Sequence, residues 1–306
     1  MIFNGERTAF GRHETFSLRY SWLPKGYQAL QKNNSIFTAE DATLILGVGK
    51  NMVSSIRYWL RACQIIDAET LLPTPIGELI FSSLYGLDPY LEDEATLWLL
   101  HWLLATNPEQ ATACYWFFNR YHKPEFSNTE LLTALSDFVA EEVVKAKRPA
   151  NSTMKNDVQL VLRMYSQTKA NARIPLEESL DSPLSELRLI TQSSGGQRYL
   201  SRPDHRPSLP IEVLGFAVLQ LLQTKQVKAL PIEDLMYVRD SFCAPGAVFR
   251  LTESALITKL EQLVESYPKQ FAIRDTAGIH QFFVLQTLDP LELLKAHYKG
   301  NGGVAA

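Results

Sequence analysis

The segment Asp41-Ala-Thr-Leu-Ile-Leu-Gly-Val-Gly-Lys-Asn-Met-Val-Ser-Ser-Ile-Arg-Tyr-Trp-Leu-Arg-Ala62 decides the fold of the first part of this chain. It predicts two amphipathic helices separated by a glycine-containing turn at residues 47–50, which is typical of a helix–turn–helix. In the second helix, Met52, Ile56, Trp59 and Leu60 recur at helical spacing and predict a buried stripe. The polar side chains of this helix should therefore face outward.

That outward face carries side chains that bond phosphates and base edges: Lys50, Asn51, Ser54, Arg57 and Arg61. We expect the three cations to contact DNA phosphates, and Asn51 or Ser54 to reach base edges. Two alternatives stay open, because a polar helix face can simply be solvated and because winged-helix folds also serve as protein-docking modules.

The flanking residues extend this pattern to an arm plus winged helix–turn–helix over residues 1–90. Residues 8–20 alternate apolar and polar from Phe16 onward and predict a short strand or an extended arm. A helix is expected at 22–31, and Thr38 is a good N-cap for a helix at 39–46. Residues 65–72 predict a β-hairpin with a two-residue turn, which would form the wing.

The rest of the chain predicts a mainly α fold with small β-hairpins. Helices are expected at 91–104, 109–121, 128–146 and 156–168, within a helical domain over residues 91–172. Residues 173–210 are rich in turn-forming and polar residues and predict a linker or a long loop. In residues 211–306, three helices followed by a hairpin at 271–285 outline a winged-helix-like domain, with Thr252 capping the third helix.

The charge of the chain is unevenly distributed. The net charge is −3, so a surface that binds DNA must be local. Residues 145–173 hold seven cations against a single acid, Asp157, and therefore carry a net charge of +6. We expect this segment, including Lys155 and Arg163, to contact phosphates independently of base sequence. The alternative is a solvated helix surface.

The sequence lacks the motifs that several functions require. Cys63, Cys114 and Cys243 are far apart, which argues against a zinc ribbon, an iron–sulfur cluster or a disulfide framework. No phosphate loop is present, so ATP hydrolysis is not expected. The first residues lack a signal-peptide pattern and the apolar runs are too short to cross a bilayer, so we expect a cytoplasmic protein without membrane contact.

Two short segments contain candidate catalytic residues. In the first, Gly11-Arg-His-Glu-Thr15, the pair His13 and Glu14 could act in acid–base chemistry or hold a metal ion. Adjacent side chains on a strand point to opposite faces, which weakens this interpretation. The alternative is a structural arm in which Arg12 and Arg19 pair with acids.

The second segment, Arg274-Asp-Thr-Ala-Gly278, places a carboxylate where a strand enters a turn. Asp275 could ligate Mg²⁺ or Mn²⁺, with Arg274 and His280 close in sequence. A hydrolytic site for phosphodiesters usually needs several carboxylates around its metal ions, and the partners of Asp275 are not evident. The alternative is that Asp275 shapes a β-turn in which Gly278 supplies a positive φ.

Motifs along the chain resemble one known family. They are Gly11-Arg-His-Glu-Thr-Phe16, Trp22-Leu-Pro-Lys-Gly26, Leu46-Gly-Val-Gly-Lys-Asn-Met52 and Leu97-Trp-Leu-Leu-His-Trp102 and, more loosely, Ser182-Pro-Leu-Ser-Glu-Leu187 and Pro245-Gly-Ala-Val-Phe249. On these motifs the chain resembles the SspB-type proteins of bacterial single-stranded DNA phosphorothioation (Ssp) systems. The resemblance covers nearly the whole chain, and the motifs in the first sixty residues of the chain are specific to this family.

The resemblance implies a DNA-nicking component of a phage-defence module, which we expect to be an endonuclease dependent on a divalent metal ion. The partners that it implies are double-stranded DNA, a cysteine desulfurase, an ATPase and a PAPS-reductase-like sulfotransfer protein; a homodimer is left open. Catalysis would be sought at His13, Glu14 and Asp275. A hypothesis of another class is a non-catalytic winged-helix adaptor or transcriptional repressor.

Overall fold

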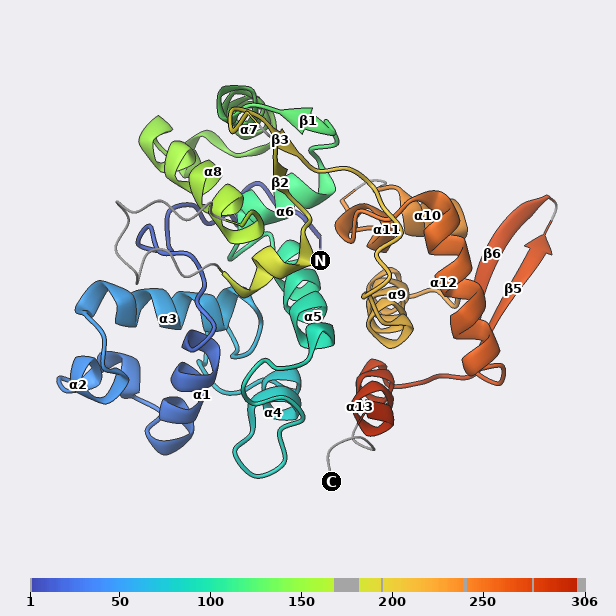
Figure 1. Cartoon of the computed structure of the whole chain (residues 1–306), viewed down its shortest axis with the longest axis horizontal. Coiled ribbons are helices and arrows are strands. Elements are labelled where there is room, and N and C mark those ends of the chain that lie inside the picture. Colours follow the sequence, from blue (N-terminus) through green and yellow to red (C-terminus); the bar gives the residue numbers. More distant parts are fainter. Residues whose placement is uncertain (1, 168–181, 194, 239–240, 277, 302–306) are drawn as a thin grey trace. The chain divides into compact units, whose positions relative to one another are not determined.

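The computed structural model describes residues 2–167, 182–193, 195–238, 241–276 and 278–301. The chain divides into two compact units (Figure 1). The larger unit consists of residues 4–117 and 121–202, and the smaller unit of residues 1–3, 118–120 and 203–306. The described residues are mainly helical with two small antiparallel sheets, which confirms the predicted fold class at this level.

The larger unit begins with the helices around the predicted helix–turn–helix. In chain order they are α1 (Trp22–Lys32), the 3-10 turn η1 (Ile36–Thr38), α2 (Ala42–Leu46), α3 (Lys50–Ala62) and α4 (Pro75–Phe81). The turn between α2 and α3 starts at Gly47, which has a φ of +59°. α3 packs on both α1 and α2. The two helices and the turn that the sequence predicts are therefore present.

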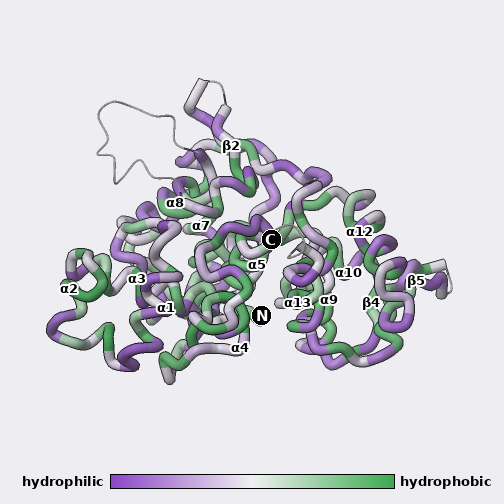
Figure 2. Tube along the Cα trace, turned by 60° about the horizontal axis from the view of Figure 1, so that its bottom comes forward, coloured by the Kyte–Doolittle hydropathy of each residue, from purple (hydrophilic) through white to green (hydrophobic). Residues whose placement is uncertain are grey.

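α2 is shorter than predicted. Thr38 ends η1 instead of capping α2, and Asp41 precedes α2 without a capping side-chain hydrogen bond. Leu46 is buried, whereas Leu44 and Ile45 are exposed. This apolar helix (Figure 2) thus packs one face on its neighbours and leaves another uncovered.

The predicted wing is not a β-hairpin. Residues 65–72 contain no strand, and the segment closes through an isolated antiparallel bridge between Ile66 and Pro73. The turn is organised by Asp67, whose Oδ1 accepts hydrogen bonds from the backbone N–H groups of Glu69 at 3.1 Å and Thr70 at 2.8 Å. Pro73 has no N–H to donate, which opposes continuation of the pairing. The prediction of a two-stranded wing here is wrong.

The middle of the larger unit is built on a fully buried helix, α5 (Glu94–Ala105), in which every residue from Ala95 to Ala105 is buried. Its start is fixed by Asp93, which accepts a hydrogen bond from the Ala95 N–H at 2.8 Å. Replacing a buried tryptophan such as Trp98 or Trp102 by alanine typically costs roughly 3–5 kcal/mol. The elements that follow are α6 (Thr112–Asn119), β1 (Glu125–Phe126), α7 (Asn128–Glu142), the 3-10 turn η2 (Lys145–Lys147) and α8 (Asn151–Tyr165).

Part of the predicted linker belongs to the larger unit. The 3-10 helix η3 (Pro183–Leu187) packs on α5 and α8. Strands β2 (Thr191–Gln192) and β3 (Tyr199–Leu200) join β1 in an antiparallel sheet with the order β1-β3-β2. Residues 173–181 and 194 of the predicted linker lie outside the described residues. The two units thus differ from the predicted division at 1–90, 91–172, 173–210 and 211–306.

The smaller unit contains α9 (Ile211–Lys225), β4 (Ala229–Pro231), α10 (Ile232–Met236), α11 (Pro245–Val248), α12 (Glu253–Ser266), β5 (Phe271–Thr276), β6 (Ile279–Val284) and α13 (Pro290–Asn301). The predicted cap is present, because Thr252 Oγ1 accepts a hydrogen bond from the Ala255 N–H at 3.2 Å. The predicted hairpin is present as β5 and β6, and β4 adds a third strand in the order β4-β6-β5. No helix in the described ranges is long and apolar enough to cross a membrane.

Candidate nucleic-acid interface

The polar face of α3 is accessible, as its sequence predicts. Lys50 and Asn51 are exposed, whereas Ser54, Arg57 and Arg61 are half-buried. The opposite side of the helix is buried and includes Val53, Ile56, Trp59 and Leu60. Lys50, Arg57 and Arg61 have no ion pair with an acid in the part of the chain that the structure describes. This face therefore presents cations whose charges are not neutralised by neighbouring side chains.

The segment Gly11–Thr15, hereafter the arm loop, is fixed to two helices of the larger unit. His13 and Asp157 of α8 are each 2% exposed, and His13 Nε2 lies 2.5 Å from Asp157 Oδ1. The Gly11 N–H donates to the same carboxylate, at 3.0 Å from Oδ1 and 3.2 Å from Oδ2. Ser55 Oγ of α3 donates to the His13 carbonyl at 2.7 Å. The arm loop thus joins α3 to α8.

Gly11 allows the arm loop to approach α8 closely. Its φ is +67°, in the left-handed region that glycine adopts without strain. A Cβ atom at this position would lie only 2.7 Å from Cγ2 of Thr153 on α8. A larger residue would therefore force either the Thr153 side chain or the arm loop to shift.

The backbone beyond His13 is held in an uncommon conformation. Glu14 and Thr15 have φ values of 49° and 66°, which non-glycine residues rarely adopt. The Thr15 N–H donates to His13 Nδ1 at 3.1 Å, and Arg163 Nη2 of α8 donates to the Thr15 carbonyl at 3.0 Å. Because Nδ1 accepts a hydrogen bond, the ring proton lies on Nε2, which donates to Asp157. The histidine therefore organises the loop through both ring nitrogens.

The pair of His13 and Asp157 is closed off from solvent. Tyr58 and Cys114 lie around it, and burial, with a further contribution from the Asp157 charge, raises the pKa of both groups. The space left there is about 10 Å³, roughly enough for one water molecule. Glu14 is exposed, so it does not form the predicted pair with the buried His13. His13 instead contacts an acid that is distant in sequence.

Three arginines gather where the arm loop meets α3. Arg61 is partly buried, which lowers its pKa, and the positive charges of Arg57 and Arg12 lower this pKa further; Asp67 has the opposite effect. Arg61 Nε is buried and has no hydrogen-bond partner among the described residues. We call Arg12, Arg57 and Arg61 the arginine cluster.

The alternative role for the arm arginines, pairing with acids, is not observed in the described ranges. Arg12 is exposed and has no ion pair there. Arg19 lies over two aromatic rings, 5.1 Å from the centroid of Trp22 and 5.9 Å from that of Phe16. Arg19 therefore packs against the aromatic side chains of the arm, whereas Arg12 is a member of the arginine cluster.

The basic segment at 145–173 is only partly a free cationic surface. Lys155 is exposed on α8, and its charge has no acidic partner in the described ranges. Arg148 donates to the carbonyls of Val143 at 2.9 Å and Ala140 at 2.5 Å, and so completes the end of α7. Lys169 and Arg173 lie outside the described residues. Since the single acid of the segment, Asp157, is buried against His13, it does not neutralise the exposed surface of α8.

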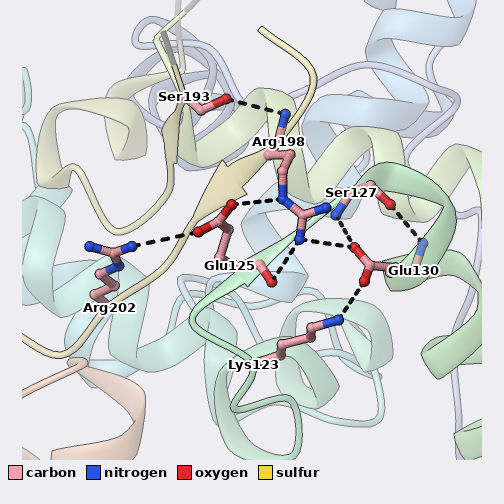
Figure 3. A network of polar contacts seen from close by, with 7 residues as sticks. All are labelled: Lys123, Glu125, Ser127, Glu130, Ser193, Arg198 and Arg202. Atoms are coloured by element: carbon pink, nitrogen blue, oxygen red, sulfur yellow. Dashed lines mark hydrogen bonds and ion pairs between the residues drawn. The ribbon is translucent and has the colours of Figure 1, made fainter. Parts of the chain in front are cut away.

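A second group of cations in the larger unit has the opposite character. At the β1-β3-β2 sheet, Arg198 lies 2.7 Å from Glu125 and 3.4 Å from Glu130, Arg202 lies 3.6 Å from Glu125, and Lys123 is bonded to Glu130 (Figure 3). Glu130 also forms a capping box with Ser127 at the start of α7. These cations stabilise the local structure through acids, which the arginine cluster lacks.

Asp275 lies on β5 of the smaller unit, opposite His280 on β6. Its Oδ1 is 2.8 Å from His280 Nδ1, and both side chains are about two-thirds exposed, at 66% and 67%. Gly278 has a φ of +79°, as the turn interpretation predicts. Position 277 in this turn lies outside the described residues. Within the described part of the chain, no group of three or more His, Cys, Asp or Glu residues is arranged to hold a metal ion.

The structure brings together some predicted residues and adds others. Sequence analysis did not assign Asp157 to the site, although a single acid between the apolar residues Met154 and Val158 of a basic helix could have indicated a buried carboxylate. It also left Arg12 without a DNA-binding role. The candidate catalytic residues His13 and Glu14 belong to the larger unit and Asp275 belongs to the smaller unit.

Comparisons with known proteins place the chain in a family. It is similar to a solved structure described as "SspB crystal structure", with 28% identity, a TM-score of 0.82, and coverage of 97% of this chain and 89% of that chain. It is equally similar to a "Magnesium ion-bound SspB crystal structure", with 27% identity, a TM-score of 0.82, and coverage of 96% and 89%. No match was found among curated proteins. The predicted resemblance to the SspB type is confirmed over most of the chain. A family model matches residues 10–298, and the chain therefore belongs to the family described as "Protein of unknown function (DUF4007)".

Proposed function

We propose that this protein binds double-stranded DNA as a component of a DNA sulfur-modification (phosphorothioation) system and nicks one strand. Its likeness to the SspB structures supports membership of such a system. The observation that carries the DNA-binding role is the arginine cluster, in which three cations influence one another and none forms an ion pair with an acid among the described residues. Proteins bind DNA largely through such cations, because each neutralised phosphate releases counterions.

In this proposal, α3 acts as the recognition helix of a helix–turn–helix module. Lys50, Arg57 and Arg61 contact phosphates and set the position of the helix, whereas Asn51 and Ser54 reach base edges. Ser54 Oγ donates to the Lys50 carbonyl at 3.5 Å, a long hydrogen bond that a base edge could replace. The accessibility of this face supports the assignment.

α8 supplies a second, sequence-independent contact in the same proposal. Lys155 would bind a phosphate directly. Arg163 has two roles, because its hydrogen bond to Thr15 holds the arm loop and its exposed guanidinium remains available to DNA. The arm loop supports this arrangement because it ties α3 and α8 to one another.

Nicking would require a divalent ion, and the residues present offer few ligands for it. Mg²⁺ prefers oxygen ligands and is often held by one or two carboxylates together with substrate phosphates. Asp275 supplies one carboxylate, which is already engaged with His280. The described residues therefore do not form a magnesium site by themselves. His13, enclosed with Asp157, fits a role in positioning the arm loop, and Glu14 stays an exposed candidate.

Membership of a phosphorothioation system implies the other partners of this protein. A cysteine desulfurase, an ATPase and a PAPS-reductase-like protein would supply and transfer sulfur, and a nick made by this protein would expose one strand for that exchange. The direct experiment is conversion of supercoiled plasmid to open circles, with Mg²⁺, with Mn²⁺ and without either ion, alongside duplex binding by anisotropy. Conversion together with salt-dependent binding supports the proposal. Binding without conversion favours the non-catalytic adaptor or repressor.

A further inference from the structure

The arginine cluster is built by two segments that the fold fixes relative to one another. Arg57 and Arg61 are four residues apart on α3 and therefore share one face of the helix. Arg12 lies between Gly11 and His13, which both bond Asp157. The His13 carbonyl is also bonded to Ser55, two positions before Arg57 on α3. The position of Arg12 beside α3 thus follows from buried contacts and not from a flexible surface.

The arginine cluster lowers the stability of the fold when no anion is bound to it. Like charges repel, and a buried donor without a partner, such as Arg61 Nε, costs free energy. At the β1-β3-β2 sheet the same unit pairs its cations with acids, as Glu125 and Glu130 do for Arg198 (Figure 3). A cluster of three arginines without an ion pair to an acid among the described residues is the arrangement expected of a site whose counter-charge comes from a ligand.

We propose that Arg12, Arg57 and Arg61 together hold one phosphate group, so that they form a single built anion site and not three independent contacts. Guanidinium groups offer paired donors that match phosphate oxygens. A tetrahedral phosphate anion also reduces the mutual repulsion of the three cations. In DNA the occupant is one backbone phosphate, so this inference rests on the proposed function and assigns Arg12 to it. The same chemistry would accept inorganic phosphate or sulfate at higher concentration.

The test compares melting temperatures of the full chain in phosphate, in sulfate and in chloride at matched ionic strength. The expected result is a higher melting temperature in phosphate and sulfate than in chloride, and the loss of this difference in Arg12→Gln. Arg12 is exposed, so its replacement should not disturb folding. The control Lys123→Gln removes a cation that is bonded to Glu130 and should keep the difference. Arg12→Gln should also melt higher than the wild type in low salt, because repulsion is relieved.

A second arm uses duplex DNA. One shared phosphate predicts that the slope of log affinity against log salt falls by about 0.9 in total when Arg12, Arg57 and Arg61 are all replaced. Independent contacts would lower the slope by about 0.9 for each arginine. Additive slopes, or no difference between phosphate and chloride in the wild type, would overturn the shared site while leaving DNA binding intact. Phosphate stabilisation without duplex binding would instead refute the proposed function and retain the anion site.

Discussion

His13 and Asp157 are 144 positions apart in the sequence and meet in the interior of the larger unit, with Nε2 of the histidine 2.5 Å from Oδ1 of the aspartate. Both residues are only 2% exposed to solvent. Through the Gly11 N–H and the Ser55 hydroxyl, this contact determines where the arm loop lies between α8 and α3. The placement of Arg12 at the proposed DNA face therefore depends on a pair that DNA itself would not touch.

Replacing His13 by alanine should strongly destabilise the protein. The change leaves the Asp157 carboxylate buried without its main partner, and loss of the hydrogen-bond partner of a buried polar group costs about 1–3 kcal/mol, and more when that group is charged. Urea unfolding would measure the loss. Glu14→Ala, at an exposed neighbouring position, should change stability by less than about 0.5 kcal/mol. The double variant His13→Ala/Asp157→Leu should recover part of the loss; no recovery would show that the histidine acts through packing alone.

Reversing the charge of Lys155 should weaken duplex binding equally for DNA of different sequences. The exposed Lys155 has no acidic partner among the described residues, and a phosphate contact carries no sequence information. Affinity of Lys155→Glu for two unrelated duplexes tests this. Lys269→Glu, an equal change of charge at an exposed position of the smaller unit, is the control. A loss of affinity confined to one duplex would indicate base readout. An unchanged affinity would favour the alternative that α8 has only a solvated polar surface.

Glu130 should make the stability of the larger unit depend on acid pH. Its hydrogen bond to Lys123, followed by the bond from the Ser127 N–H, lowers its pKa from 4.5 to about 2. A carboxylate with a depressed pKa contributes stability above its unfolded value, and this contribution is lost as the pH falls from about 4.5 toward about 2. Urea midpoints measured down to about pH 3 should therefore fall more steeply for the wild type than for Glu130→Gln. If the urea midpoints of the two proteins fall in parallel as the pH is lowered, the proposed contribution of Glu130 to stability is contradicted.

The metal assignment at Asp275 predicts loss of nicking without loss of fold. Asp275→Asn keeps the volume and removes the charge, and a neutral amide is a poorer ligand for a hard cation. The exposed contact to His280 contributes at most about 1 kcal/mol, so the melting temperature should change little. Plasmid nicking and thermal melting are measured on the same preparation. Nicking at the wild-type rate would leave Asp275 a turn residue, and parallel loss of nicking and fold would place the chemistry elsewhere.

The elements that could be predicted from the sequence are those with local causes. α3 has a regular apolar stripe, α12 begins at a capping threonine, and the hairpin of β5 and β6 has a glycine at its turn. The predicted wing lacks such support, since Asp67 organises a turn and Pro73 ends the pairing. β2 and β3 are two residues long, and β3 pairs with β1, more than seventy positions earlier, so the sequence pattern of this segment predicted a linker.

The residues of the candidate site also divide into those placed by local sequence and those placed by contacts distant in sequence. The polar face of α3 follows from helical periodicity, which depends only on nearby residues. The position of Arg12 depends on a loop with two non-glycine residues of positive φ and on a buried carboxylate on α8, and neither is a local property of the arm. For this reason the sequence predicted the outward polar face of α3 but not the arginine that completes the proposed anion site.

The most direct test of a DNA-binding face on α3 compares two double variants that each lose two positive charges from the larger unit. Arg57→Ala/Arg61→Ala removes cations of the arginine cluster, whereas Lys123→Ala/Arg198→Ala removes cations that acids already neutralise. Duplex affinity and its salt dependence are measured by anisotropy. We predict that the first variant binds at least about tenfold more weakly, with a salt slope reduced by about 0.9 or more, and that the second keeps its affinity within about twofold. Equal losses in both variants would show that only net charge matters, and no loss in the first would contradict the proposed interface.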